Sequence, residues 1–203
     1  MDMEILDSYI TVATPAEVEV KIERSVFLGW VREVSTEEEA RAAISERQRL
    51  HREATHNCFA YRLGLPPREI VYYSDAGEPS GTAGRPILGA ILSSGLTNVV
   101  IVVTRYFGGK KLGKRGLIEA YSEVARRTLE KAGRVVKVIT RQAELVCNYS
   151  GLDRILKLLN SCGGRVAEAE YGEEVRLTVE VPVGVWEQFC KDIEAWVRSI
   201  RYL

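Results

Sequence analysis

The sequence lacks the features that mark membrane, secreted or low-complexity proteins. Among its 203 residues, no run approaches the roughly 18 consecutive apolar residues that a membrane-spanning helix needs. The first stretch, MDMEILDSYI, is acidic and has neither the basic start nor the apolar core of a secretory signal. No internal repeat is visible. We therefore expect a cytoplasmic globular protein with no membrane partner.

Cysteine and histidine are too scarce and too scattered to indicate a disulfide framework or a metal site. The two histidines, His51 and His56, precede Cys58 with a spacing that matches no zinc pattern, and nothing marks a third group that would orient a Cys58–His56 catalytic dyad. None of the four cysteines forms a C-x-x-C pair; they are Cys58, Cys147, Cys162 and Cys190. We expect them to be free, small buried or half-buried residues, and we expect no metal and no cofactor.

An excess of charge of one sign is also absent, since 28 Lys and Arg balance 28 Asp and Glu. Net charge therefore indicates no polyanionic partner. The local exception is TRYFGGKKLGKRG, residues 104–116, which follows a run of β-branched residues and contains no acid. Its five cations are Arg105, Lys110, Lys111, Lys114 and Arg115.

Hydrophobic periodicity predicts an α+β first domain. Residues 16–34 alternate between apolar and charged side chains, which favours a hairpin turning at Arg24 and Ser25. Ser35 and Glu38 form a capping-box pattern at the start of a helix. The β-rich runs NCFAYRL and EIVYYSD, separated by GLPPR, predict an antiparallel pair.

The second half of this domain continues the pattern. Pro86 suits the first turn of a helix. NVVIVVTRYF predicts a central strand that is buried on both faces. A long helix is expected from about Leu117 to Lys131 and ends at Gly133.

The pattern changes near residues 136–140, where we place a domain boundary. After it, the order of predicted elements is β-α-β-β-α, which is typical of a ferredoxin-like unit. The last helix is expected to extend over residues 185–200, so that only RYL remains for a final strand. We therefore predict two domains, 1–137 and 138–203. The second would have a missing or shortened last strand and an unpaired sheet edge open to a partner.

The glycine-rich stretch resembles a phosphate-binding loop without completing the motif. Gly108, Gly113 and Lys114 match most of G-x-x-x-x-G-K-[ST], but Arg115 stands where a hydroxyl would hold Mg²⁺. A weaker interpretation is that the backbone N–H groups of Gly108, Gly109 and Gly113 and the five cations bind an anion or a phosphate backbone. The alternative is a solvated turn whose glycines only permit positive φ.

A second polar loop, YYSDAGEPSGTAGRP, covers residues 72–86 and is longer than most connections. Asp75 and Glu78 are candidate acid/base residues or cation ligands, while Ser80 and Thr82 are candidate nucleophiles or phosphate ligands. Against this, Asp and Ser in turns often cap their own backbone. Together with Ser80, Thr82, Tyr106 and Phe107, we expect Gly81 and Gly84 to line a cleft.

Three segments together resemble the IMPACT family and its bacterial, YigZ-like branch: ATHNCFAYRLG, SDAGEPSGTAGRPIL and VVTRYFGGKKLGKRGLIEAYSEVA. The resemblance covers nearly the whole first domain, and the element order after it is similar to that of the family's bacterial C-terminal domain. It implies a first domain like the second domain of small-subunit ribosomal protein five. It also implies a ferredoxin-like second domain similar to the last domain of elongation factor G. The family pattern has glycine where Arg115 stands.

The resemblance also implies a role in translation, because eukaryotic members are translational regulators that act through a protein partner. We expect a non-enzymatic regulator that binds RNA or the ribosome through the cationic glycine-rich stretch, with Tyr106 and Phe107 stacking on bases. The alternative is an enzyme for a small phosphorylated or carboxylated substrate, using Asp75, Glu78, Arg105 as anion clamp and His56 as proton carrier. A third interpretation gives the C-terminal domain a protein partner.

Overall fold

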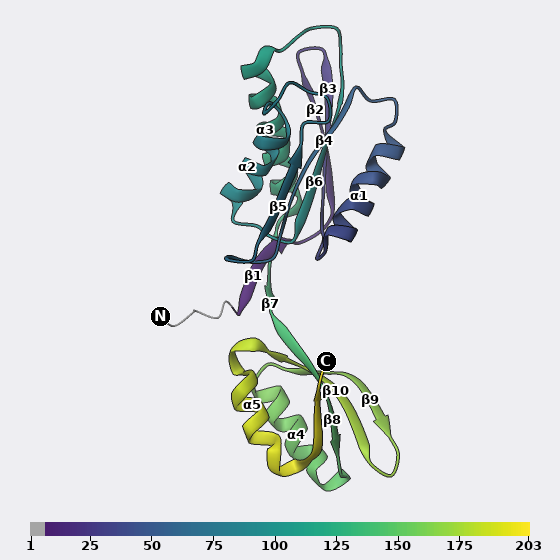
Figure 1. The fold of residues 1–203 in the computed structure, drawn as a ribbon, viewed down its shortest axis with the longest axis vertical. Coiled ribbons are helices and arrows are strands. Elements are labelled where there is room, and N and C mark those ends of the chain that lie inside the picture. Colours follow the sequence, from purple (N-terminus) through teal and green to yellow (C-terminus); the bar gives the residue numbers. More distant parts are fainter. Residues whose placement is uncertain (1–6) are drawn as a thin grey trace. The chain divides into compact units, whose positions relative to one another are not determined.

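The computed structural model describes residues 7–203, which form two compact units. One unit is Tyr9–Val136, and the other contains Lys137–Leu203 with Asp7 and Ser8. Both units combine helices with antiparallel strands, so the predicted two-domain α+β class is confirmed (Figure 1). Within residues 7–203, no helix combines the length and the apolar character needed to cross a bilayer.

The unit Tyr9–Val136 is built on a five-stranded antiparallel sheet with the order β2-β3-β6-β4-β5. Figure 1 shows α2 and α3 on one face of this sheet and α1 on the other. The strands are β2 (Ala16–Ile22), β3 (Ser25–Glu33), β4 (His56–Leu63), β5 (Ile70–Ser74) and β6 (Val99–Tyr106). The helices are α1 (Glu37–Leu50), α2 (Gly84–Ser94) and α3 (Gly113–Ala132). Two further strands, β1 (Ser8–Val12) and β7 (Arg134–Val138), pair with each other.

The central strand β6 organises the core of this unit, as its continuous apolar run predicts. Residues 99–103 are fully buried. Because side chains alternate along a strand, Ile101 and Val103 pack in the cluster under α2 and α3, whereas Val100 and Val102 pack in the cluster under α1. The hairpin predicted around Arg24 and Ser25 is confirmed, with its turn at Glu23 and Arg24, and so is the β4–β5 antiparallel pair.

Two helix starts differ from the sequence prediction. The cap of α1 is Thr36, not Ser35: the Thr36 hydroxyl accepts the Glu39 N–H at 3.2 Å, and the Glu39 carboxylate accepts the Ser35 N–H. The box is therefore shifted by one residue. Helix α3 begins at Gly113, one turn before the predicted Leu117. Glycine disfavours helix, so the glycines at this end indicate a loop in the sequence.

The second unit has a β-α-β-β-α-β order with four antiparallel strands arranged β11-β8-β10-β9, which is ferredoxin-like. Its elements are β8 (Thr140–Cys147), α4 (Tyr149–Ser161), β9 (Arg165–Tyr171), β10 (Val175–Pro182), α5 (Trp186–Ile193) and β11 (Val197–Tyr202). Short 3₁₀ turns, Val183–Val185 and Glu194–Trp196, flank α5.

The expectation of a missing last strand is wrong. Helix α5 ends at Ile193, and β11 pairs with β8, covering the edge expected to be open. The apolar residues Ile193, Val197 and Ile200 are spaced by four and three, which is typical of a helix. A register shift between Val197 and Ser199 instead lets both Val197 and Ile200 face the core from a strand.

Candidate functional site

The loop between β5 and α2 is anchored by the Asp75 carboxylate. It accepts the backbone N–H groups of Gly81, Ala83 and Gly84 at 2.8, 2.9 and 2.9 Å. Burial alone would raise the pKa of Asp75, but these three donors outweigh it and the pKa lies below its ordinary value. Asp75 thus caps α2, because Ala83, the N-cap residue of this helix, has no side chain that could accept a hydrogen bond.

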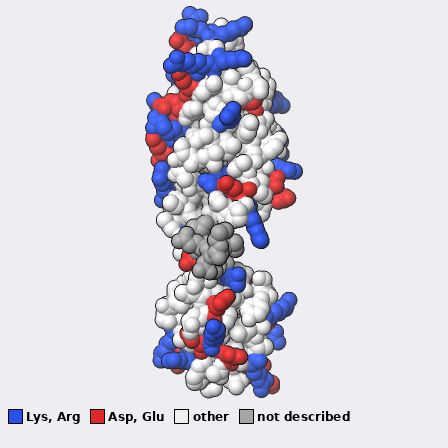
Figure 2. Space-filling model, turned by 60° about the vertical axis from the view of Figure 1, so that its left-hand side comes forward, with Lys and Arg blue, Asp and Glu red and all other residues white. Residues whose placement is uncertain are grey.

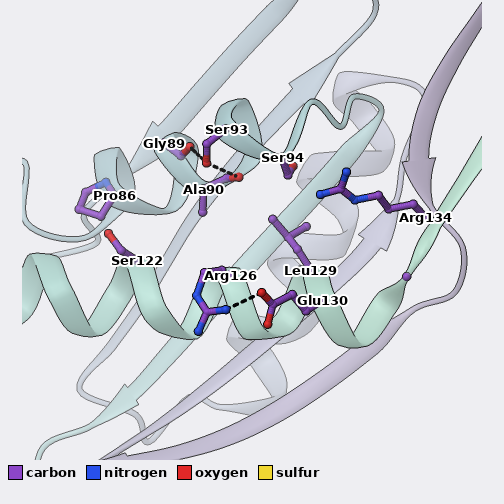
Figure 3. Close-up of a pocket in the computed structure, with 11 residues that line it drawn as sticks. Pro86, Gly89, Ala90, Ser93, Ser94, Ser122, Arg126, Leu129, Glu130 and Arg134 are labelled. Atoms are coloured by element: carbon purple, nitrogen blue, oxygen red, sulfur yellow. Dashed lines mark hydrogen bonds and ion pairs between the residues drawn. The ribbon is translucent and has the colours of Figure 1, made fainter.

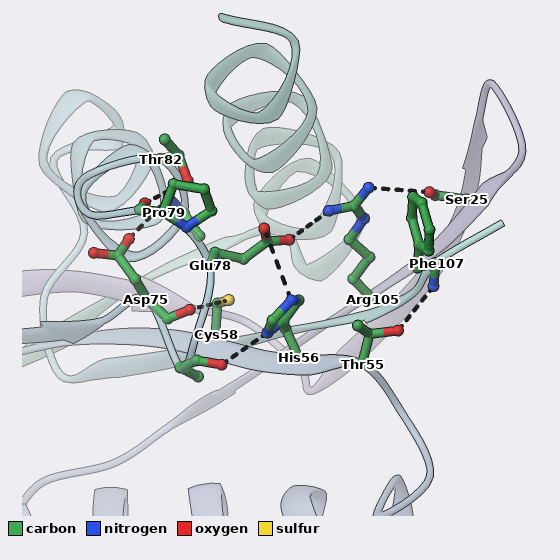
Figure 4. A network of polar contacts seen from close by, with 12 residues as sticks. Ser25, Thr55, His56, Cys58, Asp75, Glu78, Pro79, Thr82, Arg105 and Phe107 are labelled. Carbon is green, nitrogen blue, oxygen red and sulfur yellow. Dashed lines mark hydrogen bonds and ion pairs between the residues drawn. The ribbon is translucent and has the colours of Figure 1, made fainter. Parts of the chain in front are cut away.

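Consequently Asp75 is not placed as an acid or base beside the other candidates. Its carboxylate points away from Glu78 and His56 (Figure 4). Thr82 is buried and donates its hydroxyl to the Pro79 carbonyl at 2.6 Å. A Cβ on Gly84 would lie 2.7 Å from the Ser74 backbone. Much of this loop therefore serves its own turn structure.

Glu78, from the same loop, is the centre of a buried polar cluster. Its side chain is only 3% exposed. Its Oε1 accepts hydrogen bonds from Arg105 Nη1 at 2.7 Å and from the Tyr121 hydroxyl at 2.8 Å. Since Arg105 lies on β6 and Tyr121 on α3, one carboxylate connects the loop to the sheet and to a helix.

Arg105 is separated from the other cations of the glycine-rich stretch. The sequence places Arg105 in one group with the lysines that follow it in the chain. In the structure Arg105 lies on β6, and its side chain is only 6% exposed. The guanidinium lies 5.5 Å from the Phe27 ring and 5.3 Å from the Phe107 ring, and Nη2 donates to the Ser25 hydroxyl at 3.2 Å. Within residues 7–203, its Nε has no hydrogen-bond partner. Arg105 is therefore a buried ion-pair residue, not a surface phosphate contact.

His56 and Cys58 complete the cluster from β4. In the register of the sheet, His56 is directly opposite Arg105. His56 Nδ1 lies 2.9 Å from the Ala76 carbonyl, so this nitrogen carries a proton, and Nε2 is 3.9 Å from Glu78 Oε2. The Cys58 thiol donates to the Asp75 carbonyl at 2.9 Å, and burial raises its pKa to about 12. Cys58 is therefore a protonated core thiol and does not form a dyad with His56.

The structure thus brings together three of the four residues of the enzyme alternative: His56, Glu78 and Arg105 (Figure 4). The cluster is closed, and His56 is its most exposed member, at 20%. In the described part of the chain, no three His, Cys, Asp or Glu side chains gather where they could hold a metal ion.

The exposed cations of the glycine-rich stretch form a separate surface, which we call the cationic tip. It consists of Arg24, Lys110, Lys111, Lys114 and Arg115, all exposed. Figure 2 shows basic side chains gathered at the top of the view, on the unit Tyr9–Val136. A Cβ on Gly108 would lie 1.6 Å from the Arg24 carbonyl oxygen, so the glycine lets the loop pack on the β2–β3 turn.

Acidic neighbours neutralise part of the positive charge of the tip. Lys110 pairs with Glu23 at 2.7 Å, and Arg115 pairs with Glu119 at 2.8 Å. Lys111 and Lys114 have no acidic partner in the residues that the structure describes. Gly109 and Gly113 are exposed and have φ values of 86° and 69°, so both use the left-handed conformation that favours glycine.

The remaining predicted residues fall into two environments. The Tyr106 hydroxyl bonds to His51 Nδ1 at 2.9 Å, whereas Phe107 is 43% exposed beside the tip. Ser80 is exposed and Gly81 half-buried.

Sequence reasoning missed Tyr121 and Ser25. Tyr121 occupies a helix position typical of the core and packs edge-on against Phe27, so only its hydroxyl signalled a polar role.

Comparisons with known proteins cover both units. The model of the Impact N-terminal domain matches residues 23–129, and that of a domain of unknown function, DUF1949, matches 145–198. IMPACT family member YvyE of Bacillus subtilis is 39% identical over 177 residues, 87% of this chain and 81% of the relative. IMPACT family member YigZ of Escherichia coli is 32% identical over 195 residues, 96% of each. A crystal structure of a hypothetical protein superposes with a TM-score of 0.72 at 31% identity over 98% of both chains.

Proposed function

Because this chain belongs to the IMPACT family, we propose that it regulates translation by binding RNA, free or in the ribosome, through the cationic tip and without catalysing a reaction. The observation that carries the proposal is the exposure of the tip on the glycine-rich loop that opens α3. The translational role itself rests on the family resemblance.

The tip has the chemistry that a phosphate backbone requires. Lys111 and Lys114 are exposed and hold no internal ion pair within residues 7–203, so they can contact phosphates without first breaking a bond. Helix α3 starts within the tip, and its first backbone N–H groups add partial positive charge there. Sequence-independent binding to phosphates needs no deep pocket, which agrees with a convex loop.

Phe107 adds a surface on which a base can stack. It is 43% exposed and adjoins the loop, with the Arg105 guanidinium behind it at 5.3 Å. A flat aromatic side chain beside a row of cations is the combination that single-stranded RNA-binding proteins use.

The test is an RNA-binding titration at several salt concentrations. Changing Lys110, Lys111, Lys114 and Arg115 together to Ala should weaken binding. On single-stranded RNA, the slope of log affinity against log salt should fall by about 0.7 for each phosphate that the variant no longer neutralises. The matched control changes four exposed cations of the other unit to Ala and alters net charge equally: Arg154, Lys157, Lys191 and Arg201. Equal salt-dependence slopes for the two quadruple variants would show that the tip does not take part in RNA binding.

Ribosome co-purification with and without nuclease distinguishes the partners. Retention that nuclease abolishes and that the tip variant lacks supports the proposal. Retention that persists after nuclease and maps to residues 138–203 alone supports the protein-partner interpretation of the second unit instead.

A second candidate function draws on the convergence of His56, Glu78 and Arg105. We propose as the alternative an enzyme for a small phosphorylated or carboxylated substrate, with His56, the most exposed residue of the cluster, as proton carrier. A thermal-shift screen with such compounds should then show a stabilisation that His56→Ala loses. Shifts unchanged by His56→Ala would count against this alternative.

A further inference from the structure

A groove runs along the outer surface of the unit Tyr9–Val136, between α2 and α3 (Figure 3). Its volume is about 660 Å³, within the range of small-molecule sites. From α2 it is lined by Gly89, Ala90 and two serines, and from α3 by Leu129, which is almost fully buried. The groove is distinct from both the cationic tip and the Glu78 cluster.

The surface of the groove makes few polar demands on a ligand. Ser93 donates its hydroxyl to the carbonyls of Gly89 and Ala90, as Figure 3 shows, and Ser94 donates to the Ile91 carbonyl. Both hydroxyl donors are therefore satisfied within α2. An apolar chain can therefore lie against Ser93 and Ser94 without leaving either hydroxyl donor buried and unpaired.

Gly89 is the residue that keeps the groove open. It lies inside α2, and it is not among the glycines with positive φ. A Cβ built on it would meet no heavy atom within 4 Å. Neither backbone conformation nor crowding therefore requires glycine, although glycine inside a helix lowers stability relative to alanine. Any larger side chain at this position would project into the groove.

One end of the groove carries a cation that has no ion-pair partner among residues 7–203. Figure 3 shows the Arg134 guanidinium directed toward Ser94 and Leu129. No acidic side chain of the described chain pairs with Arg134. The other arginine of the lining, Arg126, is already held by Glu123 and Glu130. The groove thus combines an apolar floor with a single available positive charge at one end.

We propose that this groove binds a linear amphipathic carboxylate, an unbranched alkyl chain whose carboxylate pairs with Arg134. The alkyl chain lies over Leu129, Gly89 and Ala90 toward Pro86 and Ser122 at the far end. The guanidinium fork matches a carboxylate in two parallel hydrogen bonds, which fixes the orientation of the chain. Binding at this site is independent of RNA binding at the tip.

The experiment titrates the full-length protein with decanoate below its micelle concentration, followed by ¹H–¹⁵N NMR. Decyltrimethylammonium, with the same chain and the opposite charge, is the control ligand. Decanoate should shift the amides of Gly89, Ala90 and Gly133, and the cationic ligand should bind about tenfold more weakly or not at all. Shifts scattered over the surface, or equal affinity for both ligands, would overturn the proposal.

Variants separate the two parts of the site. Gly89→Leu fills the groove with a strong helix former and should abolish decanoate binding, while Ser45→Leu on α1 should leave it unchanged. Arg134→Gln should weaken decanoate binding about fivefold to tenfold, and Arg85→Gln, an exposed cation of α2 outside the groove, should not. Binding unaffected by Gly89→Leu would overturn the proposal.

A further experiment with lipid vesicles tests whether the carboxylate ligand is free in solution or held in a membrane. Flotation with vesicles that contain decanoate in a neutral lipid tests a membrane-held ligand. Binding of monomeric decanoate without flotation supports a free ligand in the groove. Flotation that occurs without any binding of the monomer would contradict the groove as the binding site.

Discussion

Removing the Glu78 carboxylate should destabilise the unit Tyr9–Val136 strongly. Glu78→Ala leaves the Arg105 cation buried, with Nη1 losing its 2.7 Å partner and Nε already unpaired within residues 7–203. The Tyr121 hydroxyl loses its 2.8 Å acceptor as well. Breaking a buried ion pair by deleting one partner costs about 3–5 kcal/mol. That is a large part of the roughly 5–15 kcal/mol that stabilises a domain.

Urea denaturation followed by circular dichroism measures this loss. The matched control is Glu119→Ala, which removes a carboxylate from the exposed Arg115–Glu119 pair and should change stability little. The double variant Glu78→Ala/Arg105→Met should recover part of the loss, because no unpaired charge remains buried. A cost below about 1 kcal/mol for Glu78→Ala, or no recovery in the double variant, would refute the assignment of a buried ion pair.

Three further predictions each concern a single side chain or glycine. The folded pKa of Asp75 lies below its ordinary value of about 4, so its stabilisation is present above that pH and is lost as pH falls through the lower folded value. When the pH is lowered from about 5 to about 2, the urea midpoint of the wild type should therefore fall further than that of Asp75→Asn. Equal falls in the two proteins would contradict this. Because burial raises the pKa of Cys58 to about 12, iodoacetamide at about pH 8 should modify the half-buried Cys162 before it modifies Cys58. Peptide mass spectrometry measures both rates, and equal rates would contradict the prediction. Gly108→Ala should lower stability by about 1–3 kcal/mol in urea unfolding, because its Cβ would lie 1.6 Å from the Arg24 carbonyl oxygen; an unchanged midpoint would speak against the close approach.

Local sequence patterns predicted most of the fold because they report burial directly. The continuous apolar run of β6 and the alternation of residues 16–34 each have one simple structural solution. The carboxyl-terminal strand was missed because the register shift of β11 imitates helical spacing at Val197 and Ile200. A bulge of this kind is set by pairing with β8, which no local pattern records.

The candidate site was harder to predict because its members meet across the sheet. Glu78 was identified as a polar loop residue, yet its partners Arg105 and Tyr121 are 27 and 43 residues further along the chain. Arg105 was grouped with the surface lysines that follow it, although strand alternation and register place it beside His56. Whether a basic residue such as Arg105 is buried, or exposed like the lysines after it, depends on which strands and loops pack against it. Only the three-dimensional structure shows that packing.

The long sequence separation of the Glu78 contacts has a consequence for how the unit opens. The loop is connected to β6 and α3, and it also holds the start of α2 through Asp75. It therefore cannot detach by local fraying, because release requires the sheet and the helices to separate. The amide hydrogens of Ala83 and Gly84, both bound to Asp75, should exchange with solvent as slowly as those in the middle of β6. A surface loop would then report on global unfolding of the unit.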